Sequence, residues 1–256
     1  MSPLTLTEAL EKIDQTFGID KILSDFDRNF MVRYYTQSEI GYRTYHSEQD
    51  CVHMALNEDG VFNTQGYYAQ PKTVETHLQS LNAKQVLELG CGKGFNSVFL
   101  ADRNPETMFT GIDLTPLHVK IAQKKAVDLK NLSFMQGDFN HLPFADGQFD
   151  VVFAVECLCH STNVPRTLAE IYRVLRPGGR LVVFDGYRSA EFENQEASLR
   201  TAQKLTEVAM AVQDGMNDID NWSNTSSEVG FKLLESADLS QAIKPTVYRL
   251  QQLSAR

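Results

Sequence analysis

The sequence predicts an α/β protein with a doubly wound, mainly parallel sheet. A short apolar run over 86–89 ends in a turn with glycine at three alternate positions, Gly90, Gly92 and Gly94. A helical pattern over 95–103 follows directly, and apolar runs then alternate with helical patterns to about residue 186. A strand, a tight glycine turn and a helix open a nucleotide-binding sheet, so we expect a ligand at this turn.

The three glycines have separate physical roles. One permits the turn, one lets backbone approach a ligand without an intervening Cβ, and one seats the helix against the strand. The helix N-terminus offers unpaired N–H groups to a carboxylate or phosphate. The turn alone is a moderate signal, because a structural turn or another nucleotide site would use the same residues.

Length and charge narrow the class of protein. The chain has 256 residues, which suits one α/β domain over 71–256 with an added N-terminal segment over 1–70. The net charge of −9 would repel a phosphate backbone, so we expect no nucleic-acid partner. We also expect no transmembrane segment, because no apolar stretch is long enough, and residues 1–20 lack the pattern of a secretory signal.

The cysteines indicate a reducing compartment. Cys51, Cys91, Cys157 and Cys159 do not form the pattern of a disulfide framework, so a cytoplasmic location is the simplest interpretation. Cys157 and Cys159 precede His160, but one residue rather than two separates them and no second ligand pair lies nearby. We therefore expect no metal site.

The N-terminal segment combines helices with tyrosines. Apolar spacing predicts helices over 4–17 and 71–81, and a helix or a turn plus a helix over 20–35. Six of the nine tyrosines lie ahead of the glycine turn, which suits a lid that buries its rings or a pocket wall. The two interpretations are compatible. The candidate substrate-binding residues are Tyr34, Tyr42, His46, Tyr67 and Tyr68.

Further strands follow the glycine turn, and two of them end in acids. The second runs over 108–112 and ends at Asp113, about twenty residues beyond the turn, where an acid takes the ribose hydroxyls of a nucleotide. Capping of the next helix by Asp113 is the weaker alternative, because Thr115 and Pro116 can begin that helix. A third strand over 132–136 precedes Gly137-Asp138-Phe139, and a fourth over 149–155 ends at Glu156.

Two motifs carry a resemblance to a known family. Glu88, Gly90, Gly92 and Gly94 match E-x-G-x-G-x-G, and residues 175–181 read L-R-P-G-G-R-L after a helix over 164–175. The chain resembles the class I S-adenosylmethionine (SAM)-dependent methyltransferases, with their Rossmann-like fold, from about residue 86 to 186. The resemblance implies SAM as cofactor, with Asp138 reaching the adenine amino group. The cofactor-binding residues that we expect are Glu88, Gly90, Cys91, Gly92, Gly94, Asp113, Leu114, Asp138 and Phe139.

The C-terminal part departs from this family. We expect a long helix over 190–213 and a sixth strand over 231–237. The family's final antiparallel strand has no convincing counterpart, since 247–250 is too short and polar. Either the chain is shortened or a tail from another subunit completes the sheet edge, so homodimerisation stays open.

The end of the fourth strand supplies the candidate catalytic residues, Glu156 and His160. Glu156-Cys157-Leu158-Cys159-His160 resembles the E-x-x-C-H of sterol and isoprenoid C-methyltransferases, and the tyrosine-rich segment is loosely similar to theirs. Carbon methylation creates a carbocation that aromatic faces stabilise, and Glu156 or His160 would accept the proton lost afterwards. The alternative is a structural His160, with Glu156 contacting backbone near the cofactor.

Three functions remain as hypotheses. The favoured one is SAM-dependent C-methylation of a small, apolar, isoprenoid-like or aromatic natural-product acceptor. The second is N- or O-methylation of a small molecule, with His160 as general base. The third is a non-catalytic SAM-binding scaffold.

Overall fold

The computed structural model describes residues 4–24, 30–47, 49–189, 191–212 and 215–254. Within them, five parallel strands form one sheet in the order β3-β2-β1-β4-β5. The strands are β1 (Gln85–Leu89), β2 (Met108–Asp113), β3 (Leu132–Gln136), β4 (Phe149–Val155) and β5 (Leu175–Phe184). The doubly wound α/β fold predicted from the sequence is confirmed.

Helices precede the sheet, connect its strands and follow it. The α-helices are α1 (Leu6–Phe17), α2 (Ile19–Ser24), α3 (Phe30–Gln37), α4 (Glu39–Gly41), α5 (Ala69–Leu81), α6 (Phe95–Arg103), α7 (Pro116–Lys125), α8 (Val164–Val174), α9 (Ala197–Ala209), α10 (Ile219–Val229) and α11 (Ser240–Ser254). One π-helical turn, η1 (Tyr42–His46), and three 3₁₀ turns, η2 (Thr64–Tyr68), η3 (Leu158–His160) and η4 (Phe192–Asn194), complete the helical elements of the described residues.

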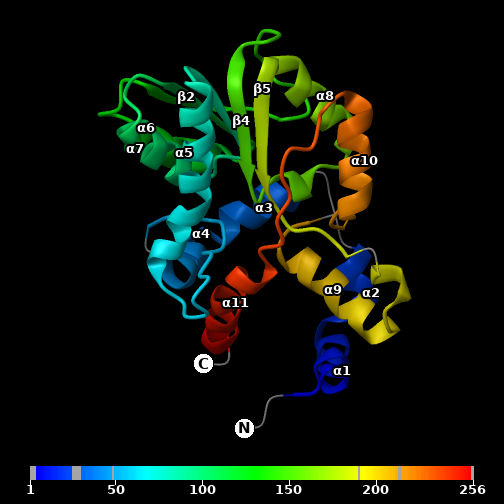
Figure 1. Cartoon of the computed structure of the whole chain (residues 1–256). Helices are drawn as coiled ribbons and strands as arrows, with labels where there is room; N and C mark the ends of the chain where they lie inside the picture. Colours follow the sequence, from blue (N-terminus) through cyan, green and yellow to red (C-terminus); the bar gives the residue numbers. More distant parts are fainter. Residues whose placement is uncertain (1–3, 25–29, 48, 190, 213–214, 255–256) are drawn as a thin grey trace.

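The two faces of the sheet bury separate apolar cores. Side chains alternate across a strand, so Val86 of β1 joins the core beneath α5, α6 and α7, while Leu87 and Leu89 join the core beneath α8 and α10. Figure 1 shows these helices on either side of the sheet. β4 is buried along almost its whole length, because both of its faces are covered.

The N-terminal segment, α9 and α11 gather at the carboxyl end of the sheet (Figure 1). Helix α1 begins with a capping box between Thr5 and Glu8, and α1 and α2 both pack against α9. Helix α11 is attached to the stretch before η2, since the Thr246 hydroxyl donates to the Ala55 carbonyl and the Asn57 amide donates to the Ala242 carbonyl. Segments from both ends of the chain therefore cover the strand ends.

The C-terminal expectations need correction. The strand expected over 231–237 does not form: Phe231 packs on Tyr172, and the stretch makes no strand pairing among the described residues. Residues 247–250 lie inside helix α11. The helix expected over 190–213 is shorter, as α9, and the end points 190 and 213 lie outside the described residues, as do 25–29 of the expected 20–35 helix.

One buried lysine holds the N-terminal segment against the glycine turn. Lys93 is only 1% exposed, and its Nζ lies 3.2 Å from a carboxylate oxygen of Glu39 and 3.3 Å from one of Asp50. Lys125 also reaches Asp50, at 3.0 Å. Because a buried ammonium is unfavourable without partners, these carboxylates fix the position of the segment that carries them.

Replacing this lysine tests the attachment. Lys93→Met keeps the aliphatic stem and leaves Glu39 without its partner, so the free energy of unfolding should fall by about 1–3 kcal/mol in urea denaturation. Lys120→Met, on an exposed position of α7, is the matched control and should change it by less than about 0.5 kcal/mol. Equal effects of the two substitutions would contradict a structural role for the Lys93 contacts.

Candidate active site

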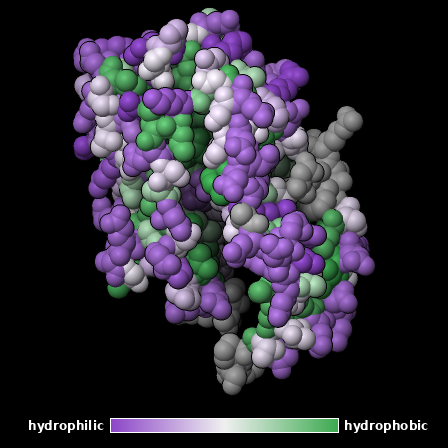
Figure 2. All heavy atoms as spheres, turned by 45° about the vertical axis from the view of Figure 1, so that its right-hand side comes forward, coloured by the Kyte–Doolittle hydropathy of each residue, from purple (hydrophilic) through white to green (hydrophobic). Residues whose placement is uncertain are grey.

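A cavity of about 2420 Å³ lies at the carboxyl end of the sheet. The glycine turn, the ends of β2, β4 and β5, and the N-terminal segment line it, and it continues along β5 beside residues 230–240. On the face in Figure 2, hydrophobic residues line a furrow that runs down the middle of the molecule. The cavity is larger than the roughly 300–1,000 Å³ of ordinary small-molecule sites, so it has room for a cofactor and an acceptor together.

The glycine turn has the backbone conformation that only glycine adopts easily. Gly90, Gly92 and Gly94 have φ values of 57°, 51° and 81°. A Cβ on Gly90 would lie 2.4 Å from the Cys157 Cβ. Gly94 does not line the cavity; a Cβ there would meet the Phe134 ring, so this glycine lets α6 pack on the sheet.

Asp113, at the end of β2, is tied to the glycine turn. Its carboxylate accepts hydrogen bonds from the Gly92 amide at 2.9 Å and the Thr115 amide at 2.8 Å. Burial would raise the pKa of Asp113, but His118 at 3.7 Å and the two amides outweigh it and lower the pKa. Asp113 therefore presents an ionised carboxylate to the cavity.

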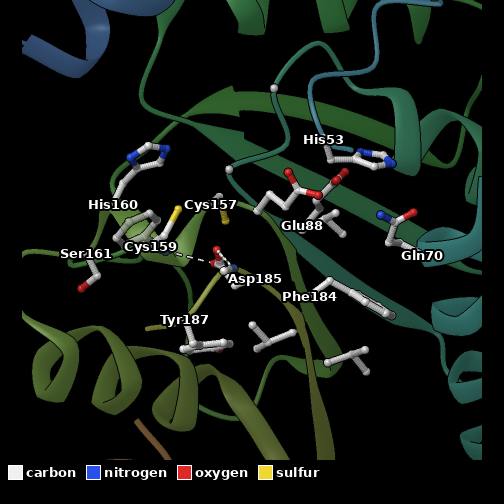
Figure 3. Close-up of a pocket in the computed structure, with 18 of the residues that line it drawn as sticks. His53, Gln70, Glu88, Cys157, Cys159, His160, Ser161, Phe184, Asp185 and Tyr187 are labelled. Carbon is white, nitrogen blue, oxygen red and sulfur yellow. Dashed lines mark hydrogen bonds between the residues drawn. The ribbon is translucent and has the colours of Figure 1, made fainter. Parts of the chain in front are cut away.

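Glu88, the residue before the last of β1, lies in a more enclosed environment than Asp113. Its two carboxylate oxygens accept from the side chains of Asn96 and Ser97 on α6. Burial raises the pKa of Glu88 to about 7, against the opposing effect of these hydrogen bonds. Figure 3 shows Glu88 in the cavity wall near Gln70.

Two buried oxygens in the cavity wall have no hydrogen-bond partner among the described residues. They are the side-chain oxygens of Gln70 and Asn96. Buried acceptors are normally satisfied, so such atoms point to a ligand that donates.

The remaining predicted cofactor residues lie in the same region. Cys91, Leu114, Asp138 and Phe139 all line the cavity. Asp138 is partly exposed, and one of its oxygens accepts from the Asn140 amide.

Glu156 joins the end of β4 to the N-terminal segment. Its φ of 49° is unusual for a residue with a side chain, and its carboxylate accepts from the Met54 amide at 2.9 Å. Burial raises the pKa of Glu156 to about 8, and Asp185 raises it further against the effect of the Met54 amide. The alternative to a catalytic Glu156 is a carboxylate that contacts backbone near the cofactor, and the bond to the Met54 amide is such a contact. Glu156 also lines the cavity.

His160 is hydrogen-bonded through both ring nitrogens. Nδ1 lies 3.2 Å from the Ala211 carbonyl, and Nε2 lies 3.1 Å from the Tyr35 hydroxyl. Burial lowers the pKa of His160, so the ring is neutral near pH 7. Tyr35 belongs to the tyrosine-rich segment, but it is not among the candidate substrate-binding residues predicted from the sequence, whereas its neighbour Tyr34 is.

The substrate candidates divide into two groups. Tyr34, Tyr42 and His46 line the cavity. Tyr67 does not: it is buried, and its hydroxyl donates to the His46 carbonyl at 2.8 Å. Tyr68 packs against Phe95 and Phe99, outside the cavity lining.

Asp185 is a further carboxylate that the sequence analysis does not select. It follows β5, accepts from the amides of Cys159 and Gly186, and burial raises its pKa to about 6. Figure 3 shows Asp185 beside Cys157 and Cys159, so the ends of β4 and β5 meet here. The sequence pattern that would have selected Asp185 is its position after an apolar run, which Asp113 and Glu156 share.

Two further observations concern metal binding and membrane spans. The described residues contain no group of three or more histidine, cysteine or acidic side chains that could hold a metal ion. None of the helices in the described part of the chain is long and apolar enough to cross a membrane.

Several known methyltransferases are similar to this chain in sequence. Phthiotriol/phenolphthiotriol dimycocerosates methyltransferase 1 of Mycobacterium ulcerans is 40% identical over 124 residues, 48% of this chain and 45% of the relative. O-methyltransferase resE of Aspergillus sclerotiorum is 29% identical over 197 residues, 70% of this chain and 72% of the relative. Sterol 24-C-methyltransferase erg6 of Schizosaccharomyces pombe is 31% identical over 170 residues, 63% and 43% respectively. The match therefore spans less than half of the mycobacterial and sterol relatives.

Solved structures share the fold. The crystal structure of the 4+2 cyclase SpnF has a TM-score of 0.71 at 22% identity, over 88% of this chain and 81% of that one. Geranyl diphosphate C-methyltransferase from Streptomyces coelicolor A3(2) has a TM-score of 0.65 at 13% identity, over 86% and 87%.

The sheet and its flanking helices have the Rossmann-like fold that solved class I SAM-dependent methyltransferases share, and the cavity lies at the carboxyl end of this sheet. Residues 87–183 match the family model described as a methyltransferase domain, and this part of the chain belongs to that family. SAM is the cofactor of the class.

The residues present fit this cofactor. The ionised carboxylate of Asp113 would accept hydrogen bonds from ribose hydroxyls, and the unpartnered oxygens of Gln70 and Asn96 would accept from the ammonium of the methionyl group. The turn at Gly90 and Gly92 lets backbone approach the ligand without a Cβ. SAM supplies an electrophilic methyl group on a sulfonium.

Removing the charge of Asp113 should weaken cofactor binding. We expect Asp113→Asn to lower the affinity for S-adenosylhomocysteine by about 10–100-fold in calorimetry, because charge-assisted hydrogen bonds contribute about 1.5–3 kcal/mol. Asp102→Asn, on an exposed position of α6, is the control. Unchanged affinity in the Asp113 variant would remove this residue from the cofactor site.

Glu156 should make stability depend on pH. Above about pH 4.5 the unfolded state ionises this carboxyl, while the folded state keeps it protonated until about pH 8, so stability falls over that window. Glu156→Gln keeps an acceptor for Met54 and removes the titration, so its free energy of unfolding relative to wild type should rise from pH 5 to pH 8. The exposed control Glu228→Gln should show no such trend. Parallel pH profiles for wild type and Glu156→Gln would contradict the raised pKa.

Proposed function

We propose that this chain transfers a methyl group from SAM to a small, apolar acceptor, isoprenoid-like or an aromatic natural product, with carbon as the favoured target. The observation that carries the proposal is that one cavity joins Asp113 to a wall of tyrosines that includes Tyr34, Tyr35 and Tyr42. Such a wall binds an apolar acceptor and stabilises positive charge next to the cofactor site. We further propose that residues 1–70 form a lid on the domain over 71–256.

Methyl transfer from SAM requires no covalent bond between the protein and the substrate. The reaction is an in-line displacement, so the chain has to align the acceptor with the methyl carbon and keep water out. The N-terminal segment suits this role because Lys93 and Glu156 attach it to the glycine turn and to β4. Aromatic faces would stabilise a carbocation formed on an alkene, and a nearby base would then accept a proton.

The names of similar proteins support the acceptor class. They mention phthiotriol, a sterol and geranyl diphosphate, which are lipids or isoprenoids. Four buried, unpaired cysteines suit a reducing compartment, and we propose a cytoplasmic location.

O-methylation is the second candidate. The O-methyltransferase resE aligns over more of this chain than the sterol and mycobacterial relatives do, and a neutral His160 suits an acceptor hydroxyl. Fold alone does not decide the reaction, since a cyclase has a similar structure. An N-methyltransferase and a non-catalytic scaffold remain outcomes of the test.

Labelled cofactor distinguishes these functions. The chain is incubated with SAM carrying a labelled methyl group and with prenyl alkenes, phenols and amines, and products are analysed by mass spectrometry. We expect label on carbon of a prenyl alkene. Label only on oxygen or nitrogen would replace the favoured reaction with the second hypothesis, and no transfer despite measured SAM binding would leave the scaffold.

A further inference from the structure

We propose that Tyr35 is the catalytic residue that takes the proton from the acceptor and passes its own proton to His160. The inference rests on the proposed function and deepens it. It assigns the proton step to a hydroxyl from the N-terminal segment, with His160 acting through that hydroxyl.

The hydrogen bonds of His160 fix the direction of transfer. A backbone carbonyl only accepts, so the contact of Nδ1 with the Ala211 carbonyl at 3.2 Å places the ring proton on Nδ1. Nε2 then carries a lone pair, and the Tyr35 hydroxyl at 3.1 Å donates to it. His160 therefore has its basic nitrogen directed at Tyr35, and an acceptor would reach this nitrogen through the phenol.

Ring contacts hold Tyr35 in place from several elements. Its ring meets the His160 ring edge-on, with centroids 5.8 Å apart, and the His118 ring at 5.5 Å. Tyr34 and Tyr42 lie at 5.1 Å and 5.9 Å. His118 in turn lies beside Asp113 at 3.7 Å. Tyr35 thus stands in the cavity wall between the acid of the ribose site and His160.

The protonation state of Tyr35 favours a transfer in which the phenol gains one proton as it loses another. Burial raises the pKa of Tyr35 well above its usual value, and Tyr42, Cys159, Tyr34 and Asp113 raise it further. The phenol therefore stays neutral and can accept a proton only while it gives one up.

Nε2 of His160 can accept a proton near neutral pH. Burial lowers the pKa of His160, against the raising effects of the Ala211 carbonyl and of Asp113. The groups that face the pair are Tyr34, Tyr42, Asp113, His118 and Cys159. Glu156 suits the step less well, because its pKa of about 8 keeps it protonated at pH 7.

The step balances for carbon methylation. The alkene π electrons form the new C–CH₃ bond as the S–CH₃ bond breaks, which leaves a neutral thioether and a carbocation. The carbocation loses a C–H proton to the Tyr35 oxygen and regains a double bond, while the Tyr35 O–H proton moves to Nε2 of His160. The positive charge of the sulfonium ends on the imidazolium, which Asp113 stabilises electrostatically. For a hydroxyl acceptor, the O–H proton follows the same route.

The first test removes one hydroxyl. Tyr35→Phe keeps the ring contacts, so kcat should fall about 100-fold or more, as for a lost general base, while the KM for SAM changes less than about threefold. Tyr248→Phe makes the same chemical change on an exposed position of α11 and should leave kcat unaltered. A kcat for Tyr35→Phe within threefold of wild type overturns the proposal.

The second test does not depend on turnover. In ¹⁵N spectra of the histidines, assigned with His160→Gln, wild-type His160 should be the tautomer protonated on Nδ1. In Tyr35→Phe its pKa should rise, because a hydrogen bond that favours the neutral ring is lost. A proton on Nε2, or a titration that Tyr35→Phe does not alter, overturns the proposal.

The outcomes separate this inference from the proposed function. A wild-type chain that methylates an acceptor while Tyr35→Phe does so equally well refutes the role of Tyr35 alone. A wild-type chain that binds SAM and methylates nothing refutes the proposed function and the proton step together.

Discussion

The contact between Asp113 and the Gly92 amide is the constraint on which the site depends. It joins the end of β2 to the turn after β1, and the Thr115 amide fixes the other carboxylate oxygen. A parallel sheet brings these ends to one edge, and glycine conformations let the turn approach the acid. The same contacts keep the carboxylate ionised despite its burial. These contacts fix the floor of the cavity.

The roof of the cavity comes from segments that are distant in sequence. Lys93 attaches α4 and Asp50 to the glycine turn, Glu156 accepts from Met54, and α11 is bonded to the Ala55 carbonyl. Each contact joins the N-terminal segment to a different part of the chain. This arrangement encloses polar groups, and the burial raises the pKa of Glu156 and lowers that of His160.

The enclosure also explains how a site without a charged nucleophile can support methyl transfer. The displacement needs an aligned acceptor and the exclusion of water. The tyrosine wall supplies an apolar surface for the acceptor and aromatic ring faces that stabilise positive charge. Proton movement then falls to neutral groups, Tyr35 and His160, whose hydrogen bond defines donor and acceptor.

The sequence by itself determined the sheet, the glycine turn and the acids at the strand ends, because local periodicity and turn chemistry are written in adjacent residues. It also predicted that Glu156 and His160 lie near Cys91 and Asp113, and all four residues line the same cavity. Only the tertiary structure decided that Tyr35 rather than Tyr67 or Tyr68 faces the cavity, that residues 231–237 form no strand, and that Lys93 is buried. These outcomes depend on contacts between segments far apart in the chain, such as Tyr35 with His160, and no local pattern encodes which partner a side chain meets.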